Sequence, residues 1–130
     1  MSGEPNLQAE TFRRRIKELI SEADGDNPTG VEQYQSKDGK ITYIGNELGR
    51  VVGELMKVLG IDRKKWGYSV WRFPNTKPIR NPNKNIQVVS LSDKSSITPG
   101  GPLTEFVTTI THEALEIGSG TTILVFLLYT

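Results

Sequence analysis

The C-terminal stretch of residues 121–129 places the strongest constraint on the fold. Its sequence, TTILVFLLY, is apolar without interruption from Ile123 to Tyr129. That run is far shorter than the ~20 residues that a helix needs to cross a bilayer. A strand that is apolar on both faces has to be covered on both sides and paired along its edges. We therefore expect a central strand of the domain's own sheet or, alternatively, a strand that completes a homo-oligomeric interface.

A first helix is predicted from Asn6, which can act as its N-cap, to Gly25. Its apolar side chains recur at spacings of three and four residues and therefore share one face. These side chains are Phe12, Ile16, Leu19, Ile20 and Ala23.

A second helix is predicted from Asn46, as N-cap, to Gly60, which stands where a C-terminal glycine belongs. Its wide apolar stripe consists of Leu48, Val51, Val52, Leu55, Met56 and Leu59. Gly49 and Gly53 lie four residues apart on one side of this helix, so we expect another element to approach it closely there.

Strands are predicted where β-branched and aromatic residues cluster between turn residues. Residues 31–44 read as a hairpin that turns at Asp38 and Gly39, and residues 68–73 (YSVWRF) and 86–91 read as single strands. Residues 75–85 hold two prolines and four asparagines, so we expect a loop there, and a second loop over residues 92–102.

Residues 103–118 allow two interpretations. Apolar side chains at heptad-like spacing, with Pro102 at the first helical position and Gly118 as a stop, favour a third helix. The β-branched string VTTIT favours a strand instead. We predict a helix, because the spacing, the start signal and the stop signal agree.

These elements predict an α+β fold: about three helices packed on one antiparallel or mixed sheet of four to five strands. The 130 residues suit a single domain, which we place at residues 6–130 after a flexible tail of residues 1–5. With no cysteine in the chain, disulfides and Cys-ligated metals are excluded. No secretory signal is evident. We expect a cytoplasmic, intracellular protein with no cofactor and no membrane partner.

Charge is distributed unevenly along the chain. Residues 57–94 carry nine basic and two acidic side chains, whereas the segments on either side each have a net charge of −3. The stretch 63–84 contains no acidic residue. Its seven basic residues are Arg63, Lys64, Lys65, Arg72, Lys77, Arg80 and Lys84. Such asymmetry bears on binding partners rather than on fold.

Basic side chains interleaved with aromatic ones are typical of nucleic-acid or other polyanion binding. We therefore take the seven basic residues as a candidate site, with Trp66, Trp71 and Phe73 as either stacking partners or core residues. If the aromatic strand is core, the turn at residues 63–65 and the loop with Lys77, Arg80 and Lys84 should supply the charge.

The segment THEALE offers a second candidate. On a helix, His112 and Glu116 would face one direction, as two ligands of an HExxH zinc site do, with Glu113 in the position of the general base. The second histidine of that motif is replaced by Glu116, and His112 is the chain's single histidine. An exposed helical face is the alternative interpretation.

No catalytic residue set emerges, so the sequence favours a small non-enzymatic binding or assembly protein. Nucleic acid or another polyanion is the first expected partner. The alternative is a homo-oligomeric interaction module, and a metal-dependent hydrolase is third. Small size and the lack of a recognisable motif would also fit a viral protein.

Overall fold

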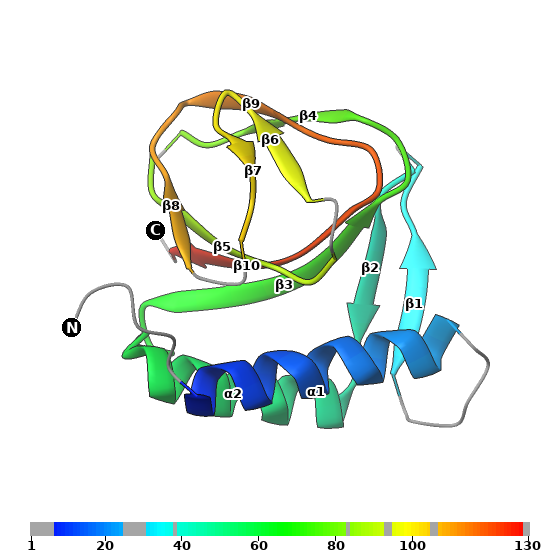
Figure 1. Ribbon diagram of the computed structural model, residues 1–130, viewed down its shortest axis with the longest axis vertical. Helices are drawn as coiled ribbons and strands as arrows, with labels where there is room; N and C mark the ends of the chain where they lie inside the picture. Colours follow the sequence, from blue (N-terminus) through cyan, green and yellow to red (C-terminus); the bar gives the residue numbers. More distant parts are fainter. Residues whose placement is uncertain are drawn as a thin grey trace.

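The computed structural model describes residues 7–24, 31–37, 39–82, 84–92, 95–104 and 107–128. In this part of the chain, two helices lie on one side of a large antiparallel sheet and a smaller antiparallel sheet lies on the other (Figure 1). The helices are α1 (Leu7–Asp24) and α2 (Asn46–Leu59). Asn6 and Gly25, the expected boundaries of the first helix, fall outside the described residues.

The larger sheet has six strands in the order β1-β2-β3-β10-β5-β8. They are β1 (Glu32–Gln35), β2 (Ile41–Ile44), β3 (Trp66–Phe73), β10 (Thr121–Leu128), β5 (Ile86–Ser90) and β8 (Thr108–Ile110). The smaller sheet has the order β4-β9-β6-β7. Its strands are β4 (Lys77–Arg80), β9 (Ala114–Ile117), β6 (Ser96–Thr98) and β7 (Gly101–Pro102).

Strand β10 confirms the expectation of a central strand. It pairs antiparallel with β3 along its whole length and with β5 on its other edge. Residues 121–126 are all buried. Because its own sheet pairs both edges of this strand, its apolar character needs no second subunit to explain it.

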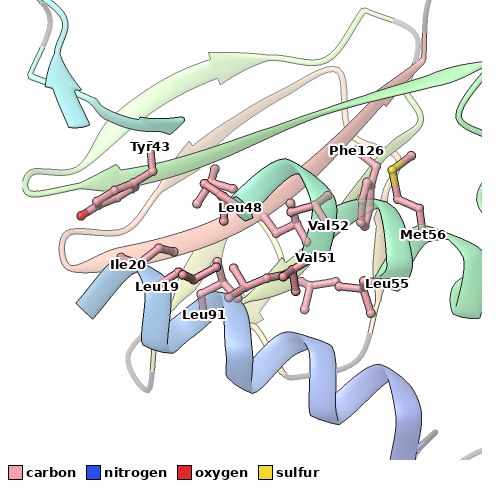
Figure 2. Packing of buried hydrophobic residues seen from close by; sticks show 14 residues of the cluster. Leu19, Ile20, Tyr43, Leu48, Val51, Val52, Leu55, Met56, Leu91 and Phe126 are labelled. Carbon is pink, nitrogen blue, oxygen red and sulfur yellow. The ribbon is translucent and has the colours of Figure 1, made fainter. Parts of the chain in front are cut away.

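The two faces of the larger sheet form two separate hydrophobic clusters. Successive side chains of a strand point to opposite faces, so Leu124 and Phe126 pack with the helices while Ile123 and Val125 pack with the smaller sheet. Figure 2 shows the helical cluster, in which the apolar stripe of α2 lies between the sheet and α1. Burial of both faces explains why β10 lacks the alternation of a half-exposed strand.

Helix α2 ends as the sequence predicts. Gly60 adopts a left-handed conformation with φ 73°. Its N–H donates to the Lys57 carbonyl at 3.2 Å, and the Ile61 N–H donates to the Met56 carbonyl at 2.9 Å. This pair of bonds is the Schellman arrangement, which satisfies carbonyls that the helix leaves open. At the other end the N-cap is Gly45, one residue earlier than predicted.

The prediction of three helices on one sheet is wrong, because residues 103–118 contain no helix in their described part. They form the segment that follows β7 and the strands β8 and β9. The described part of the chain contains two helices and ten strands in two sheets. In β9, Leu115 and Ile117 are buried while Ala114 and Glu116 are exposed, which is the alternation of a strand. Packing into the second cluster therefore outweighs the heptad-like spacing, and the β-branched residues follow their strand preference.

The predicted hairpin is confirmed as β1 and β2, although Asp38 lies outside the described residues. The predicted loops at residues 75–85 and 92–102 are partly wrong: the first contains β4, and the second contains β6 and β7. Strands β4 and β6 pair with the distant strand β9, and β7 pairs only with its neighbour β6, so local composition does not reveal this sheet. Neither described helix is long and apolar enough to cross a membrane.

Candidate polyanion interface

One end of the larger sheet brings together three strand termini. Trp66, the first residue of β3, pairs with Leu128, the last residue of β10. Phe126 of β10 pairs in turn with Gln87, near the start of β5. The segments that enter β3 and β5 therefore lie at the same end of the sheet, although about twenty residues separate them in the sequence.

Five of the seven predicted basic residues lie in the segments at this end. We call this group the basic end: Arg63, Lys64, Lys65, Arg80 and Lys84. The first three form the exposed turn between α2 and β3, Arg80 ends β4, and Lys84 lies two residues before β5. A hollow of about 170 Å³ is lined by Arg80, Asn85 and Leu128 among others, which places Arg80 against the end of β10. All five side chains are exposed.

The remaining two basic residues lie at the opposite end. Arg72 pairs with Thr122 at the start of β10, and Lys77 pairs with Ile117 at the end of β9. Arg72 shares a different hollow, of about 370 Å³, with Lys17 of α1. The structure thus divides the seven residues into a group of five and a separate pair.

The ion pairs in which both partners are described residues lie on the two helices. They join Arg13 and Arg14 to Glu10, Arg15 to Glu18, and Arg50 to Glu47. No described carboxylate lies within ion-pair distance of a basic-end side chain. The nearby Asp62 carboxylate accepts a hydrogen bond from the backbone N–H of Lys64 at 2.9 Å, and so it shapes the turn.

Two glycines of α2 leave room for the side chains of Arg63 and Tyr68 to pack closely against the helix. The Arg63 guanidinium lies over Gly53, where a Cβ would come within 2.6 Å of Nη1, and the Tyr68 hydroxyl lies over Gly49. The close approach expected at these glycines is therefore confirmed. Burial raises the pKa of Tyr68, and the positive charge of Arg63 opposes that rise.

The aromatic residues of β3 belong mainly to the core. Trp66 and Tyr68 are half-buried against the helical cluster. Phe73 is buried in the second cluster, and Trp71 packs against it edge to face with ring centroids 6.1 Å apart. The charge at the basic end therefore comes from the turn at residues 63–65, from Arg80 at the end of β4 and from Lys84, and not from the aromatic strand.

Asn81 links the basic end to the rest of the sheet, and sequence reasoning missed it. Its side chain is 1% exposed, and Nδ2 donates to the Ile110 carbonyl at 2.7 Å. Its Oδ1 accepts from the backbone N–H of Asn85 at 3.2 Å, and its own N–H donates to the Glu113 carbonyl. These bonds hold the turn that carries Lys84. The only signal in the sequence is an asparagine before a proline, which is common in turns.

We predict that Asn81→Ala lowers the free energy of unfolding by about 1–3 kcal/mol, because it leaves the Ile110 carbonyl and the Asn85 N–H without their buried partner. Urea denaturation followed by tryptophan fluorescence measures this change. Asn75→Ala is the matched control, since Asn75 is exposed and should shift stability by less than about 0.5 kcal/mol. Equal effects of the two substitutions would contradict the role given to Asn81.

The predicted zinc-binding arrangement requires a helix through residues 112–116, and the structure has no helix there. His112 and Glu113 lie in the exposed connection between β8 and β9, and Glu116 lies on β9. Without a helix, His112 and Glu116 do not occupy adjacent turns on one face. The described residues contain no group of three or more His, Asp or Glu side chains placed to hold a metal ion.

Comparison with known proteins gives no family for this chain. No protein-family model matches the chain, and no curated protein or solved structure is significantly similar to it.

Proposed function

We propose that this is a non-enzymatic binding protein that holds a polyanion, with nucleic acid as the first candidate, at the basic end. The observation that carries this proposal is the pairing of β3, β10 and β5. It brings the basic turn at residues 63–65 to the same end of the sheet as Arg80 and Lys84.

The chemistry of these residues suits phosphate contact. Lys and Arg neutralise phosphates and release condensed counterions, which drives binding without sequence preference. All five side chains are exposed, and no described carboxylate neutralises them. Since the aromatic residues of β3 are largely core, backbone contact rather than base stacking is the expected mode of recognition.

A salt titration of binding tests the proposal. The probes are a fluorescently labelled single-stranded DNA, the RNA of the same sequence and a DNA duplex, and anisotropy gives the affinity at each salt concentration. With five cations in contact, log K against log[salt] should fall with a slope of about −3.5 for single strands and −4.5 for the duplex. Absence of binding at low salt to every probe, or an affinity that salt does not change, would overturn the proposal.

A further inference from the structure

The outer edge of β1 presents unpaired backbone groups. Ser36 N–H donates to the Lys40 carbonyl at 2.9 Å, so these two residues form a hydrogen-bonded pair of the hairpin. Paired residues alternate between hydrogen-bonded and non-hydrogen-bonded positions along an antiparallel ladder. In the register of β1 and β2, Gln33 and Gln35 then direct their backbone N–H and C=O away from β2. No described strand pairs with that edge.

The other three sheet edges are protected in ways that β1 is not. Edge strand β4 carries Pro78 between charged residues, β7 consists of two residues that include Pro102, and β8 is three residues long. Proline, charge and short length are the usual means of blocking edge-to-edge pairing. Strand β1 has the sequence EQYQ: it contains no proline, its one charged residue is Glu32 at the first position, and all four residues are exposed.

An apolar patch adjoins this edge. Tyr34 is 54% exposed and Ile44 is 44% exposed, and both lie on the face of the hairpin that carries Thr42 and Trp71. Figure 1 shows β1 and β2 at the margin of the larger sheet, beside rather than beneath the smaller sheet. The two most exposed apolar side chains of the hairpin therefore lie next to its unpaired backbone.

We propose that β1 pairs antiparallel with β1 of a second copy of this chain, which joins the two larger sheets into one. A two-fold axis at Tyr34 places Tyr34 opposite Tyr34 of the second copy and Gln33 opposite its Gln35. The outward-facing residues of each copy then form hydrogen-bonded pairs, and the two tyrosines take the closer, non-hydrogen-bonded position. The charges are compatible, because each Glu32 falls opposite Ser36 of the second copy, beside its Lys37, and no like charges face each other.

Cysteine crosslinking tests both the dimer and its register, because the natural chain contains no cysteine. In Tyr34→Cys the two Cα atoms would lie about 4.5 Å apart, which suits a disulfide. In Glu32→Cys the two Cα atoms would be four residues apart along the paired strands, a separation of at least about 13 Å, and no disulfide should form. Thr109→Cys on the opposite sheet edge is the second control. After mild oxidation we expect a disulfide dimer of Tyr34→Cys alone.

Charge substitution provides an independent measurement on the same position. We expect Tyr34→Lys and Tyr34→Glu each to raise the dimer Kd at least about tenfold in sedimentation experiments, and an equimolar mixture of the two to restore it. Thr109→Lys should leave the Kd unchanged, and circular dichroism of each variant verifies the fold. The proposal is overturned if the natural chain stays monomeric up to on the order of 1 mM, if the Tyr34 variants leave the Kd unchanged, or if Glu32→Cys crosslinks as readily as Tyr34→Cys.

Discussion

Replacing Phe126 with alanine is expected to lower the free energy of unfolding by about 3–5 kcal/mol. Phe126 has an exposed fraction of 0% and lies in β10, which is paired on both edges. It belongs to the cluster that also contains Val52 and Met56 of α2, and Figure 2 shows the three side chains near one another. Truncation removes its buried apolar area and leaves a cavity that a paired central strand cannot close.

Chemical denaturation of the natural chain and of Phe126→Ala measures this loss, with the two Trp residues as the fluorescent probe. Leu7→Ala is a suitable control, because it also removes apolar side-chain atoms but from a side chain that is 77% exposed and distant from the β1 edge. We expect the control to change stability by less than about 0.5 kcal/mol. A loss below about 1 kcal/mol for Phe126→Ala would contradict the placement of this ring at the centre of the helical cluster.

Neutralising the basic end is expected to lower the affinity for nucleic acid about 10²–10³-fold near 0.1 M salt, since each lost phosphate contact costs up to roughly one decade there. The variant replaces Lys64, Lys65, Arg80 and Lys84 with glutamine. Arg63 is kept because its guanidinium packs over Gly53. The magnitude of the salt slope should also fall, by about one for each contact removed. Anisotropy titrations with the same DNA and RNA probes measure both quantities.

The matched control removes four other exposed cations: Arg14, Arg15, Lys37 and Arg50. Both variants lose the same formal charge; they differ in where the charge was and in that three of the control cations, Arg14, Arg15 and Arg50, are ion-paired to glutamates of their helices. If binding occurs at the basic end, the control should retain most of the affinity. An equal loss in the two variants would mean that overall charge, rather than this site, drives the binding.

The secondary structure that the sequence predicted correctly is the part with strong local signals. Helix α2 has both a regular apolar stripe and a terminal glycine, and α1 has the same spacing of apolar residues. Strands β3, β5 and β10 are rich in β-branched or aromatic residues. Such signals act over a few residues, and they therefore survive without knowledge of the tertiary partners.

The second sheet had no comparable local signal. Residues 114–117 (ALEI) and 77–80 (KPIR) are four-residue strands whose pairing with each other spans more than thirty residues. The spacing of apolar residues in 103–118 fits a helix, and only the β-branched string VTTIT favours a strand. Burial of Leu115 and Ile117 against the free face of the larger sheet decided between them, and that face exists only after the sheet has formed.

By itself, the sequence determined that residues 121–128 form a buried and paired strand, because an apolar strand of that length is stable only when it is covered and paired. The tertiary structure decided that both pairing partners, β3 and β5, belong to its own sheet. The sequence also determined that residues 63–84 carry the excess positive charge. The tertiary structure decided which of those charges lie together. Pairing of β3 with β10, and of β10 with β5, brings Arg63, Lys64 and Lys65 to the end where Arg80 and Lys84 lie, and leaves Arg72 and Lys77 at the other. Strand register is a long-range property, set by which side chains reach the core, and so the composition of one segment does not contain it.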